Sequence, residues 1–241
     1  MKYIVLDMGN VCCRWDPRYI ASQLTEDKDE QDFLVQSLFG SFQWQQLDKG
    51  DISINQAIQQ LTKQYPQYES LIEYTFNHWY DFFDVIDEME QFIIEYKNDY
   101  DFYLLSNCSV QFDNYYQSKS IFKYFKDYYL SAKHHMVKPD KAIFLDFLNY
   151  YHLEGRECLF VDDIEENVQG AKAAGMKGYC FDGDVNKLKK YMNVLKNENK
   201  WFKLSFFFKN TILFVLYLLT NVVKIYIILI ILLQIFWGIK Q

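Results

Sequence analysis

Residues 2–11 read KYIVLDMGNV, in which a short apolar run is followed at once by the carboxylate Asp7 and, two positions later, by Gly9. The run Tyr3–Leu6 is too short for a helix and has no polar alternation, so it predicts a strand that is buried on both faces. Such strands lie inside parallel sheets, which bind ligands at the carboxyl ends of their strands. We therefore expect Asp7 at the ligand-binding edge of a sheet.

Further short apolar runs follow along the chain and alternate with segments of helical spacing. The runs are Phe102–Leu105, Tyr128–Leu130, Cys158–Val161 and Gly178–Phe181, and the helical segments are Gln111–Tyr124, Asp140–Tyr151, Glu165–Ala174 and Asp184–Lys196. This alternation predicts an α/β fold, a doubly wound parallel (Rossmann-like) sheet of about five strands.

A long insertion, roughly Asp16 to Glu90, separates the first two strands. Its apolar residues recur at helical spacing, and Gly50 and Pro66 interrupt it. The pattern predicts a helical cap inserted after the first strand, placed to close over the carboxyl edge of the sheet. The expected domains are a core of residues 1–15 and 91–200, a cap of residues 16–90 and a hydrophobic tail of residues 201–241.

Composition excludes several classes of protein. Half of the residues are hydrophobic, and Pro and Gly number only three and nine, which argues against a disordered chain. The net charge is −7, and because residues 201–241 hold four lysines and no acid, residues 1–200 carry −11. A body this acidic is a poor partner for nucleic acid. The five cysteines include no C-x-x-C pair, which predicts free thiols in a reducing cytoplasm, with Cys158 and Cys180 in the core.

The tail differs in kind, because Lys224 is the one charged residue between Thr211 and Ile239. A membrane span needs about 20 apolar residues. Lys224 at mid-depth opposes insertion by about 3 kcal/mol, whereas each aliphatic residue favours it by about 0.3–0.6 kcal/mol. The segment therefore predicts a membrane anchor, and lysines on its amino side place the catalytic body in the cytoplasm. The alternative is appended sequence without function.

Polar side chains collect where the predicted strands end. They are Asp7, Ser106, Lys138 just beyond the third strand, and the pair Asp162–Asp163. Each residue alone has an ordinary explanation as a turn, a helix cap or surface charge. Their occurrence in order at successive strand ends favours a common site for phosphate chemistry, which requires an in-line nucleophile and neutralised phosphate oxygens.

Each of these residues has an expected role. Asp7 attacks phosphorus and forms an aspartyl-phosphate. A hard cation with oxygen ligands, Mg²⁺, joins Asp7 to the phosphate, with Asp163 as second carboxylate and Asp162 as a direct or water-mediated ligand. Lys138 screens the negative charges. Phosphate oxygens are held by Ser106 and by backbone amides around Asn107 and after Asp7, at Gly9 and Asn10.

The same residues carry a resemblance to a known family. The segments VLDMGNV at Val5–Val11, LLSN at Leu104–Asn107, VKPDKAIF at Val137–Phe144 and FVDDIEEN at Phe160–Asn167 resemble the motifs of the haloacid dehalogenase superfamily, to about Asp184. The segment WQQLDKGDIS at Trp44–Ser53 resembles the small helical-cap branch that includes glucose-1-phosphate and other sugar-phosphate phosphatases.

The resemblance implies Asp7 as nucleophile, Ser106 and Lys138 as phosphate binders, and Asp162 with Asp163 as the magnesium site. It adds the backbone carbonyl of Gly9 as a metal ligand and a small phosphorylated metabolite, such as a sugar phosphate, as substrate. The chain departs from the family at Gly9, where most of its phosphatases place a second aspartate as general acid and base. The general acid is therefore unassigned, with Asp16 and His78 as weak candidates.

Three functions remain open from the sequence. The first is a magnesium-dependent phosphatase for small phosphomonoesters. The second is a 2-haloacid dehalogenase, in which Asp7 attacks carbon and needs no metal. The third is a membrane-tethered, non-catalytic phosphate-binding or signalling module. A receiver-type phospho-acceptor is disfavoured, because there the acidic pair precedes the acceptor aspartate.

Overall fold

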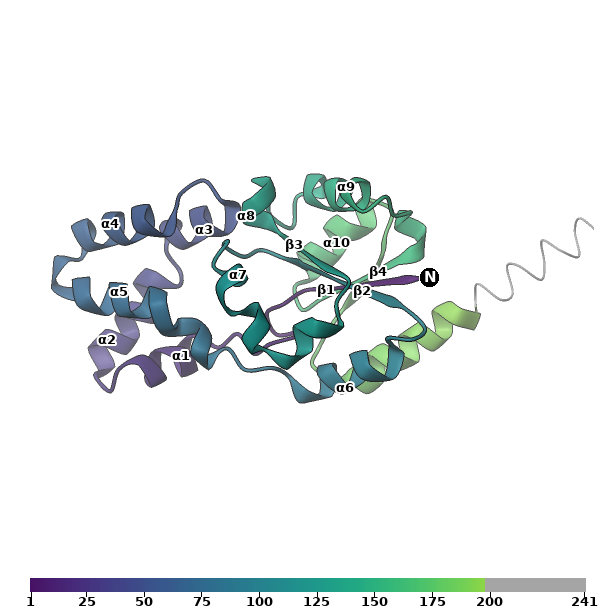
Figure 1. Ribbon diagram of the computed structural model, residues 1–241, viewed down its shortest axis with the longest axis horizontal. Coiled ribbons are helices and arrows are strands. Elements are labelled where there is room, and N and C mark those ends of the chain that lie inside the picture. Colours follow the sequence, from purple (N-terminus) through teal and green to yellow (C-terminus); the bar gives the residue numbers. More distant parts are fainter. Residues whose placement is uncertain (198–241) are drawn as a thin grey trace, which may run out of the picture. The chain divides into compact units, whose positions relative to one another are not determined.

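A computed structural model describes residues 1–197, and its centre is a parallel sheet in the order β3-β2-β1-β4-β5 (Figure 1). The strands are β1 (Tyr3–Leu6), β2 (Asp101–Ser106), β3 (Asp127–Leu130), β4 (Cys158–Asp162) and β5 (Lys177–Cys180). The predicted fold class is confirmed, and all five predicted strands are present with ends that differ by one residue at most.

The helices fall between these strands. They are α1 (Pro17–Leu24), α2 (Lys28–Phe33), α3 (Phe42–Lys49), α4 (Ile54–Gln64), α5 (Glu69–His78), α6 (Asp87–Tyr96), α7 (Phe112–Tyr115), α8 (Ser131–His134), α9 (Lys141–Tyr150) and α10 (Glu165–Ala173). A π-helical turn, η1 (Leu34–Leu38), and 3-10 turns complete the set: η2 (Pro66–Tyr68), η3 (Trp79–Phe82), η4 (Tyr116–Ser118), η5 (Ser120–Tyr124) and η6 (Gly155–Glu157). Residues 185–197 are also helical.

Helices cover both faces of the sheet because strand side chains alternate between the faces. Val5 and Phe160 pack with Phe144 and Phe147 of α9 in one buried cluster. On the other face, the ring of Phe102 meets that of Phe92 of α6 at 6.1 Å. Ile4, Val5 and Leu6 are fully buried, as a central strand requires. Cys180 lies on the edge strand β5 and is exposed, so its predicted core position was wrong.

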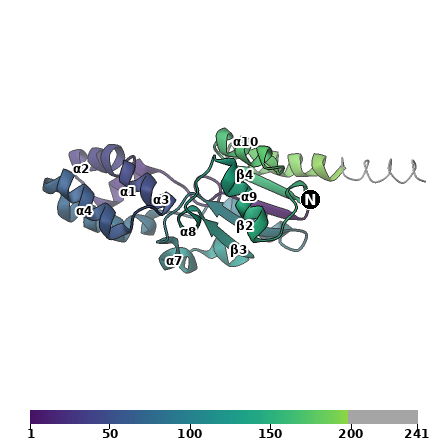
Figure 2. The same cartoon turned by 90° about the horizontal axis from the view of Figure 1, so that it is seen from above.

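The register brings the strand ends level. Leu6 pairs with Leu104 on one side and with Val161 on the other, so Asp7 and Asp162 leave the sheet side by side. Helices α1–α4 stand beyond this carboxyl edge in both views (Figures 1 and 2). Met1–Leu188 form one compact unit that includes these helices and the sheet. The exact division into core, cap and tail stays a prediction.

One predicted helix is broken. Residues 111–124 were expected to be continuous but form α7 and two 3-10 turns, because Lys119 adopts an extended backbone (φ −103°, ψ 120°). The break lets the chain fold back, and the ring of Phe122 then packs 5.0 Å from that of Phe112. Burial of both aromatic rings outweighs the local helical preference.

Within residues 1–197, the helices are too short or too polar to cross a membrane. The predicted anchor at residues 211–239 lies outside the described residues.

Candidate active site

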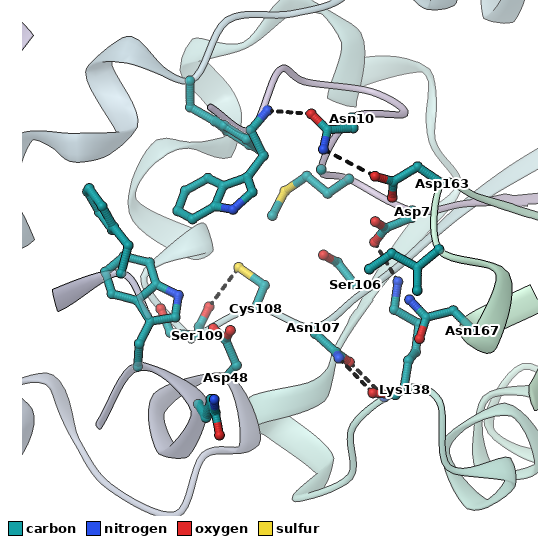
Figure 3. Close-up of a pocket in the computed structure, with 18 of the residues that line it drawn as sticks. Asp7, Asn10, Asp48, Ser106, Asn107, Cys108, Ser109, Lys138, Asp163 and Asn167 are labelled. Carbon is teal, nitrogen blue, oxygen red and sulfur yellow. Dashed lines mark hydrogen bonds and ion pairs between the residues drawn. The ribbon is translucent and has the colours of Figure 1, made fainter. Parts of the chain in front are cut away.

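The side chains predicted at the strand ends meet at one cavity of about 550 Å³ (Figure 3). The core residues that line it include Asp7, Gly9, Asn10, Ser106, Asn107, Lys138 and Asp163. Asp162 is fully buried beside Lys138 and does not itself line the cavity. The structure therefore brings together all eight residues named from the sequence.

Lys138 joins the two buried aspartates. Its Nζ lies 2.6 Å from Asp7 Oδ1 and 2.7 Å from Asp162 Oδ2, and each of the three residues is at most 7% exposed. Burial raises the pKa of Asp7 to about 6, against the opposing attraction of Lys138. Burial also opposes the charge on Lys138, but the two carboxylates outweigh it and its pKa is raised.

Asp162 is held by its surroundings on every side. Its Oδ1 accepts the backbone N–H of Ile164 at 2.9 Å, and its two oxygens accept the Asn167 amide at 3.0 and 3.1 Å. With Lys138 added, most of its lone pairs are engaged. Asp162 thus contacts Lys138 directly, and ligation of a metal by this carboxylate would have to compete with these bonds.

Carboxylate oxygens from three residues lie close together at the carboxyl ends of β1 and β4. One oxygen each from Asp7, Asp162 and Asp163 lie within 4.8 Å of one another. Burial raises the pKa of Asp163. An all-oxygen donor set of this kind fits Mg²⁺, which binds carboxylates and completes its shell with water and substrate oxygens.

Two asparagines clamp the loops around this centre. Asn10, in the left-handed region (φ 52°), donates to Asp163 Oδ2 at 3.1 Å and accepts the backbone N–H of Trp15 at 3.0 Å. Asn107 pairs with the backbone of Lys138, donating at 2.9 Å and accepting at 2.8 Å. The side chains of both residues are thus committed to holding Asp163 and Lys138.

A family model described as haloacid dehalogenase-like hydrolase matches residues 1–175. The chain belongs to this family.

This haloacid dehalogenase-like hydrolase is similar to individual known proteins. The sesquiterpene phosphatase astK of Aspergillus oryzae is 27% identical over 181 residues, 73% of this chain and 88% of the relative. A haloacid dehalogenase family enzyme of Bacteroides thetaiotaomicron, solved with magnesium and inorganic phosphate, is 21% identical with a TM-score of 0.61, covering 74% of this chain and 93% of its own.

The L-2-haloacid dehalogenase of Xanthobacter autotrophicus, solved with chloropropionic acid covalently bound, has the same fold. It is 14% identical, with a TM-score of 0.57 over 74% of this chain and 76% of its own. At these identities the two solved structures establish the fold alone.

The two weak candidates for the general acid lie elsewhere. Asp16 caps α1 by accepting the backbone N–H groups of Arg18 and Tyr19 at 3.0 Å each. His78 ends α5, where its ring pairs with Asp81 at 3.2 Å. Neither residue lines the cavity.

One residue that the helical insertion contributes to the cavity, Asp48, is not among those predicted from the sequence. Asp48 of α3 faces the core across the cavity (Figure 3). The residue is partly exposed, but burial of its carboxyl group raises the pKa well above its ordinary value, offset in part by the backbone amide of Ser109. The spacing of Trp44 and Asp48, four apart on a predicted helix, could have placed both on one face. Asn167, which holds Asp162, ends the motif FVDDIEEN, whereas no comparable signal pointed to Trp15.

Proposed function

We propose that this haloacid dehalogenase-like hydrolase is a Mg²⁺-dependent phosphatase that hydrolyses a small phosphomonoester through an aspartyl-phosphate on Asp7. The observation that carries the proposal is the buried Asp7–Lys138–Asp162 ion cluster beside Asp163. A phosphate that enters there meets one ammonium group and a carboxylate set suited to a divalent cation.

The proposed reaction has two steps. A carboxylate oxygen of Asp7 attacks phosphorus, the bond from phosphorus to the alcohol oxygen breaks, and the alcohol leaves after taking up a proton. Water then attacks phosphorus, inorganic phosphate departs, and the Asp7 carboxylate is restored. Bound Mg²⁺ would neutralise charge on the phosphate oxygens, with Asp7, Asp163 and the Gly9 carbonyl as its proposed protein ligands.

The remaining residues have supporting roles in this proposal. Ser106, at 3% exposure on the cavity wall, would hold a phosphate oxygen, together with the amides of Gly9, Asn10 and Asn107. Lys138 would neutralise charge on the phosphate, and Asp162 would hold the Lys138 ammonium group in place. The Aspergillus oryzae relative is named a phosphatase, which supports the same class of reaction, and the proposal leaves the identity of the alcohol open.

The test is phosphate release from p-nitrophenyl phosphate by the full chain. We expect activity with MgCl₂, loss of activity in EDTA, and at least a thousandfold loss in Asp7→Asn. Asp32→Asn, which removes an exposed carboxylate from α2, is the matched control and keeps full activity. An active Asp7→Asn variant would rule out Asp7 as the nucleophile.

Dehalogenation is the second candidate, because the Xanthobacter neighbour shares the fold. The cluster of three carboxylates argues against it, since attack on carbon needs no metal. Halide release from 2-chloropropionate in EDTA would favour this candidate instead. Binding of a metal–fluoride phosphate mimic without hydrolysis of any phosphoester would favour a non-catalytic phosphate-binding module.

A further inference from the structure

The helical insertion, together with Trp15 just before it, gives the active-site cavity an aromatic wall. We use this term for Trp15, Phe39, Trp44, Trp79 and Phe83, which all line the cavity and all precede β2 in the chain. The ring of Trp15 is the hub, at 5.5–6.1 Å from the rings of the other four. The wall is thus one packed apolar surface that faces the polar strand ends.

The wall begins next to the nucleophile. A Cβ placed on Gly9 would lie 3.5 Å from Trp15 Cβ, so the loop that follows Asp7 faces the Trp15 side chain. An aspartate at position 9 would give the leaving group a polar neighbour. This chain has Gly9 there instead, in contact with the Trp15 side chain. A leaving group on a phosphate at Asp7 therefore meets apolar surface immediately.

Several polar groups near the wall are engaged within the protein, whereas the Gln45 side chain, which also lines the cavity, is exposed. The Trp79 indole N–H is directed at Gln111 Oε1 at 3.5 Å, and the Cys108 thiol donates to the Ser109 carbonyl at 3.3 Å. The Ser109 hydroxyl accepts the backbone N–H of Gln111 at 3.3 Å. The Asp48 carboxyl already accepts the amide of Ser109, and burial raises its pKa, which disfavours charge at this end of the cavity.

This environment is unsuited to a sugar. Each hydroxyl buried without a partner costs roughly 1–3 kcal/mol, and a hexose would bring several. Stacking on a sugar ring needs an open aromatic face, whereas Trp15 meets Phe39 and Trp79 edge to face, at interplanar angles of 82° and 89°. Phe39, Trp79 and Phe83 are each at most 7% exposed and present only small apolar areas.

From these contacts we infer that the alcohol part of the substrate is apolar, so that the substrate is an alkyl or aryl phosphomonoester rather than a sugar phosphate. The inference rests on the proposed phosphatase function. The cavity volume of about 550 Å³ is typical of sites that enclose a small organic ligand, so a hydrocarbon group can be taken up together with the phosphate.

The test is a series of n-alkyl monophosphates from ethyl to octyl, with glucose 1-phosphate and glucose 6-phosphate for comparison. The alkyl series keeps the chemistry of the leaving oxygen constant, so a trend reports binding of the hydrocarbon. With the full chain and Mg²⁺, we expect kcat/KM to rise about two- to fourfold per methylene until the cavity is full. Both sugar phosphates should fall below hexyl phosphate by at least tenfold.

Variants on α3 assign the trend to the wall. Trp44→Ala should flatten the chain-length dependence, and Trp44→Phe should restore most of it. Phe42→Ala is the matched control, because Phe42 is 66% exposed on the same helix and is not among the residues that line the cavity. Circular dichroism confirms that each variant is folded.

A binding measurement separates this inference from the proposed function. Calorimetric affinities of the same alkyl phosphates for Asp7→Asn with Mg²⁺ should show the same trend even if no phosphoester is hydrolysed. Absence of hydrolysis with a rising affinity series would overturn the phosphatase proposal and keep the apolar site. If affinity does not change with alkyl chain length, or if either sugar phosphate binds more tightly, the inference of an apolar site is wrong, whatever the activity.

Discussion

Asp7 is a carboxylate that the fold removes from water, and its ionisation therefore opposes folding. Burial raises its pKa from 3.8 to about 6, so between these values the folded state binds more protons than the unfolded state, and stability falls as pH rises. Asparagine resembles the protonated acid. We expect Asp7→Asn in EDTA to be more stable than the parent by about 1–3 kcal/mol at pH 7.5, with little difference near pH 4.

Urea unfolding at the two pH values measures this difference. Exposed Asp32→Asn is again the control and should show no such dependence on pH. An Asp7→Asn variant that is less stable than the parent at pH 7.5 would show that the attraction between Asp7 and Lys138 exceeds the effect of burial.

Substitution of Asp162 and of its neighbour Asp163 should have different effects on stability and on the response to Mg²⁺. The fully buried Asp162 carboxylate accepts hydrogen bonds from Lys138, Ile164 and Asn167. Asp162→Asn replaces one of its accepting oxygens with an NH₂ group, which would face other donors. We expect it to lose about 2–4 kcal/mol of stability in EDTA. Asp163→Asn should keep that stability but lose the rise in Tm that MgCl₂ gives the parent. Thermal melts with EDTA and with MgCl₂ distinguish the two, and equal effects would contradict the division of roles.

At the scale of elements, the decisive contact is between the end of α3 and α8. Gly50 ends α3 in the left-handed region (φ 78°), and a Cβ there would fall well inside contact distance of the Ala132 carbonyl. The Ser131 hydroxyl also donates to the backbone carbonyl of Asp48. This close backbone contact brings Asp48 and Trp44 to the cavity.

Gly50→Ala should therefore separate α3 from α8. We expect phosphate release to fall at least tenfold, because α3 would shift and move Trp44 and Asp48 away from the cavity that contains Asp7. Gly175→Ala is the matched control: Gly175 also has a positive φ (90°) but has open space around it, so alanine there carries only the backbone strain, about 1 kcal/mol. Equal activity of the two variants would show that the contact between Gly50 and Ala132 is dispensable.

At the scale of the whole molecule, the sequence separates an acidic body from an apolar tail. The predicted membrane anchor and the cytoplasmic location of the body both depend on residues 201–241. We expect the full chain to float with phospholipid vesicles in a density gradient, and a version that ends at Lys200 to stay at the bottom. Full-length protein that remains at the bottom would contradict the anchor.

Several features follow from the sequence alone because local pattern determines them. Short apolar runs such as Tyr3–Leu6 identify interior strands, and parallel strands present their carboxyl ends at one edge, so Asp7, Ser106 and Asp163 had to meet. The helical character of the insertion also follows from its spacing. The family motifs agree, and the family model confirms the assignment.

Other features depend on contacts between segments far apart in the chain, which no local pattern records. Packing of Phe112 on Phe122 breaks the predicted helix, and the position of β5 at the sheet edge exposes Cys180. Trp44 and Asp48 reach the cavity because the end of α3 docks on α8. The sequence by itself determined the strands and the polar residues at their ends that form the proposed phosphate site. The tertiary structure decided what lines the rest of the cavity, because that surface is assembled from Trp15 and from residues of the insertion that meet only after folding.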